Sequence, residues 1–180
     1  MKKRVLCLLF TGFEEIETVA PVDVLRRAGV EVVVASLTGD KLVTGRSGIT
    51  VQSDASLADV ADQEFDLLLI PGGPGIKAVR ADGRAAKLAK TFAIAGKQIA
   101  AICAAPTVLK DAELLAGKRF TSHAGVLPEL PESRVEERVV EDGNLITSRG
   151  AATAVEFGLV LVRRLCGEAA AADVAKGIMA

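Results

Sequence analysis

The stretch over residues 96–117, GKQIAAICAAPTVLKDAELLAG, decides the fold. Its apolar run over residues 98–102 is typical of a strand that is buried on both faces, and its second half predicts a helix over residues 107–115. Between them lies Cys103, whose alanine neighbours permit the sharp, strained turn called a nucleophile elbow. A buried strand that leads through one cysteine into a helix predicts an α/β protein with a thiol at the edge of its sheet.

The same patterns continue outward in both directions from this stretch. Runs rich in Val, Leu and Ile predict further strands over residues 4–10, 31–36, 67–71 and 145–148. Helical patterns, each followed by a glycine, cover residues 15–28, 82–95 and 154–166. Hairpins are predicted over residues 41–51 and over residues 139–146, the second with its turn at Asp142-Gly143. This alternation predicts a doubly wound sandwich, in which helices cover both faces of a mostly parallel sheet.

Composition sets the size and class of the molecule. The chain has 180 residues, of which 50% are hydrophobic and 25% are charged, and this predicts one domain over residues 1–180. Its 22 basic and 23 acidic side chains are interspersed, so nothing favours a nucleic acid or an anionic membrane as a partner. The opening MKKRVLCLLF has too short an apolar run for a signal peptide, and no run approaches the roughly 20 residues that cross a bilayer. We therefore expect a cytoplasmic protein.

The cysteines and the single histidine argue against metals and cofactors. Cys7, Cys103 and Cys166 are odd in number and far apart, which excludes a Cys-x-x-Cys site and predicts free thiols. His123 is the only histidine, so we expect no metal site. The PGGPG stretch at 71–75 lacks the Lys-Ser/Thr of a phosphate loop and the spacing of a dinucleotide site. Because Trp and Tyr are also absent, we expect no cofactor.

Three loops with unusual content should meet at the carboxyl edge of the sheet, where ligands bind in such folds. They are TGFEEIET after the first strand, PGGPG after the strand at 67–71, and CAAPT at Cys103. A helix start should favour the thiolate of Cys103, and the amides of Gly72, Gly73 and Ala104 are candidates to hold an oxyanion beside it. The plainer alternatives are a buried structural cysteine and a simple tight turn.

The acids at the start of the first helix, Glu14, Glu15 and Glu17, are open to two interpretations. They can simply complement the helix dipole, or one of them can be buried beside the thiol with a raised pKa. His123 lies about 20 residues beyond the cysteine and is a candidate proton carrier, although a lone histidine that caps a loop explains it as well.

Four segments together resemble the ThiJ/PfpI superfamily and, more narrowly, its branch that contains the parkinsonism-associated deglycase: GFEEIETVAPVDVLRRAG, PGGPG, AAICAAPTVL and TSRGAATAVEF. The resemblance covers essentially the whole chain. It implies a flavodoxin-like sandwich, a homodimer and a reactive cysteine at Cys103. It also implies that Glu17 lies beside the thiol with His123 nearby, and that Gly73 and Ala104 supply the oxyanion donors.

The resemblance also implies a function. Members of this branch are described as glyoxalase III-like enzymes, as deglycases, and as oxidative-stress sensors or chaperones. We therefore expect a cofactor-independent cysteine enzyme whose substrate is a small aldehyde such as methylglyoxal, or a glycated protein. The alternative is a redox sensor whose Cys103 is oxidised to the sulfinate. The peptidase branch carries a histidine directly after the cysteine, and Ala104 at that position argues against a peptidase. For a homodimer interface, the first helix and the hairpin at 41–51 are candidates.

Overall fold

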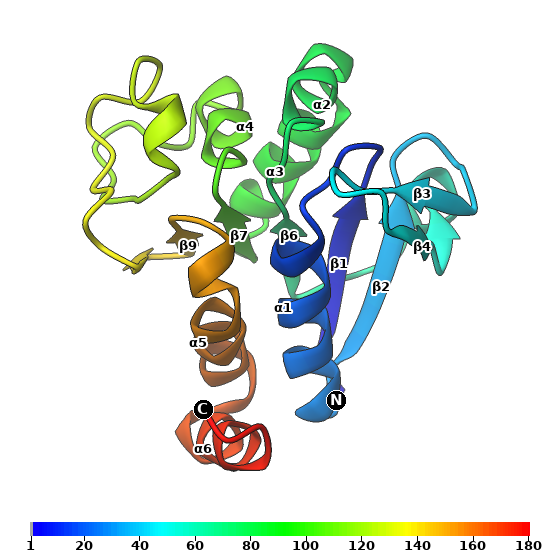
Figure 1. Cartoon of the computed structure of the whole chain (residues 1–180), viewed down its shortest axis with the longest axis vertical. Helices are drawn as coiled ribbons and strands as arrows, with labels where there is room; N and C mark the ends of the chain where they lie inside the picture. Colours follow the sequence, from blue (N-terminus) through cyan, green and yellow to red (C-terminus); the bar gives the residue numbers. More distant parts are fainter. Residues whose placement is uncertain (1) are drawn as a thin grey trace.

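A seven-stranded sheet forms the centre of the computed structural model, which describes residues 2–180. In spatial order its strands are β5 (Ala55–Ser56), β2 (Glu31–Ser36), β1 (Arg4–Leu9), β6 (Leu67–Ile70), β7 (Gln98–Ile102), β9 (Leu145–Ser148) and β8 (Val139–Asp142). All neighbouring strands run parallel except β8, which is antiparallel to β9. Figure 1 shows β1, β6 and β7 pointing toward the same end of the molecule, so the loops that follow them meet at one edge.

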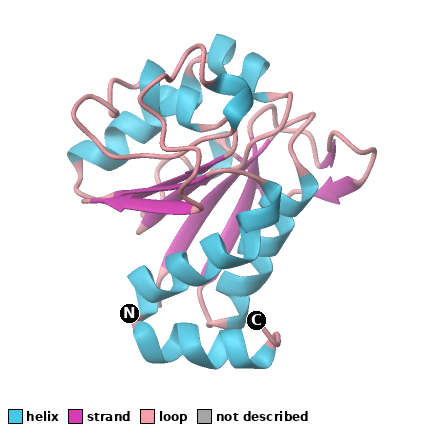
Figure 2. Ribbon diagram, turned by 60° about the vertical axis from the view of Figure 1, so that its left-hand side comes forward, coloured by secondary structure: helices cyan, strands magenta, loops and turns pink. Residues whose placement is uncertain are grey.

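Helices cover both faces of this sheet, as the alternating pattern predicts. One layer contains α1 (Glu15–Arg27) and α5 (Ala154–Cys166), which pack against each other. The other layer contains α2 (Ile76–Asp82), α3 (Arg84–Ile94) and α4 (Pro106–Asp111). Figure 2 shows the sheet between these two layers. The predicted three-layer, mostly parallel α/β sandwich is therefore confirmed.

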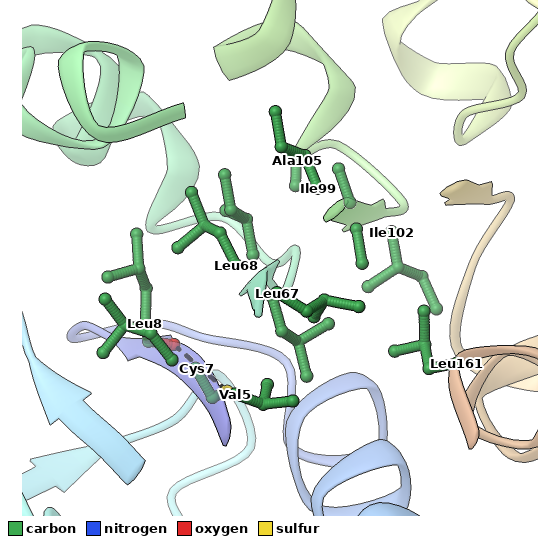
Figure 3. Packing of buried hydrophobic residues seen from close by; sticks show 14 of the residues in the cluster. Val5, Cys7, Leu8, Leu67, Leu68, Ile99, Ile102, Ala105 and Leu161 are labelled. Atoms are coloured by element: carbon green, nitrogen blue, oxygen red, sulfur yellow. Dashed lines mark hydrogen bonds between the residues drawn. The ribbon is translucent and has the colours of Figure 1, made fainter. Parts of the chain in front are cut away.

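The core explains why the central strands are apolar at every position. All four residues of β6 are fully buried, because each face of the sheet meets a helical layer. Leu67 and Leu68 project to opposite sides and pack with residues of β1, β7 and α5 (Figure 3). Cys7 lies in this core without solvent contact, where burial raises the pKa of its thiol to about 12. The thiol is free, as the sequence predicts, and it packs as part of the core.

The two predicted hairpins are present, one of them with a shifted turn. β3 (Leu42–Thr44) pairs with β4 (Thr50–Gln52) as a separate antiparallel pair beside the start of α1. In the second hairpin Asp142 pairs with Leu145, so Gly143 and Asn144 form the turn, one residue later than predicted. Gly143 has φ +62°, the left-handed conformation that this first turn position requires.

The helices differ from the sequence prediction in several places. The predicted helix over 82–95 corresponds to α3, which begins at Arg84 after Gly83 takes φ +77°, and the sequence prediction missed α2, which ends at Asp82. The predicted helix over 107–115 ends at Asp111, just before Glu113 adopts φ +60°. The sequence prediction missed α6 (Glu168–Gly177), which packs against α5 at the end of the molecule away from the strand carboxyl ends (Figure 1).

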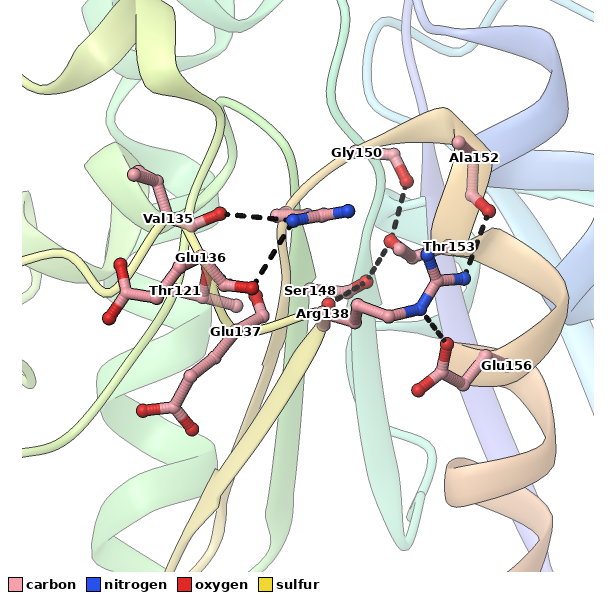
Figure 4. A network of polar contacts seen from close by, with 11 residues as sticks. Thr121, Val135, Glu136, Glu137, Arg138, Ser148, Gly150, Ala152, Thr153 and Glu156 are labelled. Carbon is pink, nitrogen blue, oxygen red and sulfur yellow. Dashed lines mark hydrogen bonds and ion pairs between the residues drawn. The ribbon is translucent and has the colours of Figure 1, made fainter.

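A polar network fixes the segment that follows β9. Thr153 donates to the carbonyl of Gly150 at 2.7 Å, and its hydroxyl also lies 2.6 Å from that of Ser148 (Figure 4). Arg138 pairs with Glu156 at 2.6 Å, and the Thr153 side chain makes no capping hydrogen bond to α5. The network holds the end of β9 in place directly beside the turn at Cys103. Within residues 2–180 no helix is both long and apolar enough to cross a bilayer.

Candidate active site

Cys103 forms the tight turn between β7 and α4 that the sequence predicts. Its φ is +64°, a left-handed conformation that few residues other than glycine adopt, and it stores strain of about 1 kcal/mol or more. Two hydrogen bonds hold this conformation: the Cys103 amide donates to Ser148 O at 2.8 Å, and the Cys103 carbonyl accepts from the His123 amide at 2.8 Å. The half-buried side chain is therefore presented at the carboxyl edge of the sheet by a fixed backbone.

Glu17 provides the acid beside this thiol. Its side chain is only 1% exposed and accepts a hydrogen bond from the thiol of Cys103. Its Oε2 also accepts from the amide of Gly72 at 3.0 Å, which fixes the carboxyl from the loop after β6. Glu14 has the capping role that the helix start allows, since its Oε2 accepts from the Glu17 amide at 2.8 Å. One of the three neighbouring acids therefore caps α1, and another reaches the sulfur.

Gly72 permits the close approach of these two side chains. A Cβ at position 72 would lie 2.6 Å from Glu17 Oε2 and 2.7 Å from the Cβ of Cys103, so no larger residue fits between them. Because the Gly72 amide already donates to Glu17, the prediction that Gly72 offers a free oxyanion donor is wrong. The amides of Gly73 and Ala104 do face the sulfur and donate to it.

Burial controls the ionisation of the site. It raises the pKa of the Glu17 carboxyl to about 7, with a smaller contribution from the charge of Glu14. Burial, followed by the negative charge of Glu17, raises the pKa of the Cys103 thiol to about 12. The expectation that the helix start lowers the pKa of this thiol is therefore wrong for the thiol considered alone, because desolvation and a neighbouring carboxylate outweigh the amide donors.

The two groups instead behave as one coupled acid. Two anions in this confined space repel strongly, so the pair loses its first proton near pH 7 and holds the second far more tightly. The amides of Gly73 and Ala104 favour negative charge on the sulfur, and the amide of Gly72 favours it on the carboxyl. Above pH 7 the pair therefore retains one proton, in the hydrogen bond between Cys103 and Glu17.

The His123 ring makes its hydrogen bond within its own loop. Its Nδ1 accepts from the amide of Gly125 at 3.0 Å, so the ring caps a short turn, and the side chain is exposed. The hydrogen bond between His123 and Cys103 described above joins backbone atoms. The capping interpretation of His123 is confirmed, and its role as a proton carrier stays a prediction.

Two clefts flank the turn. A cavity of about 350 Å³ has Gly73 and Ala104 in its wall together with Lys77, Arg80 and Glu129. A second cavity of about 430 Å³ lies on the side of His123 and Arg149. Gly73 and Ala104, whose amides face the sulfur, line the first cavity, whereas Cys103 itself lines neither. Within residues 2–180 no cluster of three or more His, Cys, Asp or Glu side chains is arranged to hold a metal ion.

Arg46 is a neighbour of the site that the sequence prediction missed. It lies in the turn of the β3–β4 hairpin, and its positive charge lowers the pKa of Glu17. The sequence gives no signal for it, because its effect on Glu17 depends on how a hairpin about 30 residues away docks on α1.

Known proteins resemble the whole chain. A family model described as the DJ-1/PfpI family matches residues 3–164. Protein dj-1beta from Drosophila melanogaster is 42% identical over 183 residues, which is 99% of this chain and 98% of that protein. A crystal structure of Drosophila melanogaster DJ-1beta superposes with a TM-score of 0.93 at 41% identity, and covers 99% and 98% of the two chains. A structure of oxidized Toxoplasma gondii DJ-1 has a TM-score of 0.92 at 33% identity, and covers 98% of each chain.

Proposed function

The chain belongs to the DJ-1/PfpI family, and from this premise we propose that it is a cofactor-independent cysteine enzyme acting on 2-oxoaldehydes such as methylglyoxal, or on their early adducts with proteins. The observation that carries the proposal is the contact of a strained, half-buried Cys103 with a buried Glu17 whose pKa is about 7. A thiol that shares one proton with a carboxyl is suited to adding to a carbonyl and then moving protons along the adduct.

The reaction begins with addition of sulfur to the aldehyde. The Sγ of Cys103 bonds to the aldehyde carbon, the remaining proton of the pair moves to the former carbonyl oxygen through Glu17, and a hemithioacetal forms. The amides of Gly73 and Ala104, which face the sulfur, are positioned to stabilise the negative charge that develops on that oxygen. The strained turn keeps all of these groups on a fixed backbone.

Glu17 then carries the proton transfers that follow. Its carboxylate removes the hydrogen from the former aldehyde carbon and the proton is returned to the adjacent carbon, which converts the adduct through an enediol to a thioester. Water cleaves the thioester to release a 2-hydroxy acid and the thiol. The aldehyde carbon is oxidised and the ketone carbon is reduced, so the substrate is its own oxidant and no cofactor enters the balance.

The wild-type protein is therefore expected to form lactate from methylglyoxal, at a rate that rises with pH through about 7 and then levels off. The reason is that the reactive pair must first lose one proton, and this loss occurs where Glu17 titrates. Lactate is measured enzymatically from pH 5.5 to 9. Absence of lactate at every pH would contradict the proposal. A rate that does not change around pH 7 would mean that ionisation of Glu17 does not control the reaction.

A second candidate function is favoured by the same contact. A buried carboxyl that still carries its proton can donate a hydrogen bond to an oxidised sulfur, which suits a redox sensor whose Cys103 becomes a sulfinate. The oxidized form of the similar Toxoplasma gondii protein makes this worth testing. If mild peroxide adds two oxygen atoms selectively at Cys103 while no lactate forms from methylglyoxal, the sensor replaces the enzyme as the leading function.

We also propose that the protein is a homodimer. Large apolar side chains are exposed on α1, on the adjoining β3–β4 hairpin and on the first turn of α5, and they are Ile16, Val19, Leu42, Ile49 and Val155. Exposed apolar residues grouped on neighbouring elements are typical of a protein–protein contact. A second copy of the chain is the simplest partner for them.

The double variant Leu42→Asp/Ile49→Asp is expected to be monomeric, because each copy would have to bury two unpaired carboxylates in the proposed interface. Both side chains are more than half exposed in the single chain, at 65% and 57%, so the substitutions leave its folding intact. Light scattering on a sizing column measures the mass. Ile94→Asp on α3, where the side chain is 83% exposed, is the control that should remain dimeric. A monomeric wild type would contradict the proposal.

A further inference from the structure

Two buried hydroxyl groups that take no part in the proposed reaction lie at the end of β9. Ser148 is the last residue of that strand and has no solvent contact, and Thr153 is 1% exposed just before α5 begins. Their oxygens lie 2.6 Å apart, and the carbonyls of Arg138 and Gly150 are within hydrogen-bond distance at 3.1 and 2.7 Å (Figure 4). A buried hydroxyl without a partner is costly, so the two groups hold each other in a fixed place.

The backbone carbonyl of Ser148 holds the turn at Cys103. β7 and β9 run parallel with Ile102 opposite Ser148, and the next amide along the chain, that of Cys103, donates to Ser148 O at 2.8 Å. This bond lies where the chain leaves the sheet and Cys103 takes φ +64°. A left-handed conformation in a residue other than glycine persists only when its surroundings enforce it. The place of Ser148 therefore bears directly on whether the strained turn is kept.

Thr153 connects the end of β9 to the helical layer that carries Glu17. α5 starts one residue after Thr153 and packs against α1, which contains Glu17. The two helices approach closely at Gly158, where an added Cβ would lie 3.1 Å from backbone and side-chain atoms of α1. Contacts therefore lead from Glu17 through the two helices to Thr153. From Thr153 they continue through Ser148 to the turn that carries the sulfur of Cys103.

We propose that Ser148 and Thr153 are positioning residues, whose paired hydroxyls fix the end of β9 to α5 so that the Cys103 thiol is held against Glu17. Neither hydroxyl is hydrogen-bonded to the thiol within residues 2–180, so both act through the backbone of the turn. The inference rests on the reactive pair of the proposed function, but it concerns the geometry of the thiol and requires no turnover of an aldehyde.

The test is the pH dependence of Cys103 alkylation by iodoacetamide. Mass spectrometry of the peptide that carries Cys103 separates this reaction from alkylation of the other two cysteines. In the wild type we expect an inflection near pH 7, where the pair of Cys103 and Glu17 loses its first proton. Lactate formation from methylglyoxal is measured on the same samples, so that the two proposals are judged separately.

Thr153→Val removes the hydroxyl and keeps nearly the same side-chain shape. Its inflection should move upward by about 1 pH unit or more, toward the value of roughly 8.5 of an ordinary thiol. The reason is that a displaced sulfur can no longer pass its proton to Glu17. The charges that act on Glu17, those of Glu14 and Arg46, are unchanged in this variant.

Three further variants separate positioning from a general loss of stability. Thr153→Ser keeps the hydroxyl and should restore the wild-type inflection. Ser148→Ala removes the partner hydroxyl and should move the inflection upward. Ser36→Ala is its matched control, because Ser36 is also a fully buried last residue of a parallel strand, β2, and its hydroxyl accepts from the Gly39 amide at 3.1 Å. This control should lower the melting temperature and leave the inflection at the wild-type value.

The double variant Ser148→Ala/Thr153→Val tests whether the two hydroxyls form one link. If they do, its shift should be no larger than the larger single shift. An unmoved inflection in Thr153→Val, an equal upward shift in Ser36→Ala, or a double shift equal to the sum of the single shifts would overturn the proposal. If Thr153→Val does not fold, Ser148→Ala, which keeps the Ser148 carbonyl, decides the matter in the same way. A shifted inflection without any lactate would contradict the proposed function alone.

Discussion

Cys103→Ser is expected to lower the rate of lactate formation from methylglyoxal by on the order of a thousandfold or more. A serine hydroxyl has nearly the shape of the thiol, so the turn with φ +64° and its hydrogen bonds to Ser148 and His123 should remain. The hydroxyl, however, holds its proton far more tightly than a thiol does. Glu17, with a pKa of about 7, cannot remove that proton at a useful rate.

Two measurements make this result specific. Cys166→Ser replaces an exposed thiol at the end of α5 and should leave the rate unchanged. Thermal melting followed by circular dichroism should show the same midpoint for Cys103→Ser and the wild type, since only one atom differs. Equal lactate rates in Cys103→Ser and the wild type would show that Cys103 is not the nucleophile, and this would contradict the proposed mechanism.

The sequence predicts the layers of this fold because burial leaves a local signature. A strand covered on both faces needs apolar residues along its buried length, and residues 67–70 and 99–102 have that pattern. The short helix α2 was missed because it directly follows the glycine- and proline-rich stretch at 71–75, which reads as a loop, and is separated from α3 only by the left-handed φ of Gly83. For α6 a signal was present: Gly167 is followed by an acid and four alanines, which is typical of a new helix start.

The site was predictable in its position and less so in its electrostatics. The small residues around Cys103 indicate an elbow from local sequence alone. The hydrogen bond from Gly72 to Glu17 joins residues 55 positions apart, and it appears only when the loops after β1 and β6 are brought together. The direction of the pKa shift of Cys103 depends on how much water the packed neighbours exclude, a quantity that no spacing of residues encodes.

The loop that carries Gly72 and Gly73 is where the structure tolerates substitution least. Gly73→Ala is expected to lower the free energy of unfolding by roughly 3 kcal/mol, because its φ of +109° is strained for any side chain and its added Cβ has no room. That Cβ would lie 2.5 Å from Gly12 O and 2.7 Å from the amide nitrogen of Glu14, and backbone atoms cannot rotate away. In a chain of this length the melting temperature should fall by roughly 6 to 12 °C.

Gly96→Ala is the matched control, since Gly96 also has a positive φ, of +65°, but has no atom within 4 Å of the added Cβ. It should lower the free energy of unfolding by only about 1 kcal/mol, the strain of a left-handed alanine. Denaturant unfolding of both variants gives the difference, which measures the steric part together with the extra backbone strain of an alanine at φ +109°. If the two variants lose the same stability, the loop after β6 is not closely packed against the start of α1. The contact that brings Glu17 to Cys103 would then have to be looser than the distances at Gly72 indicate.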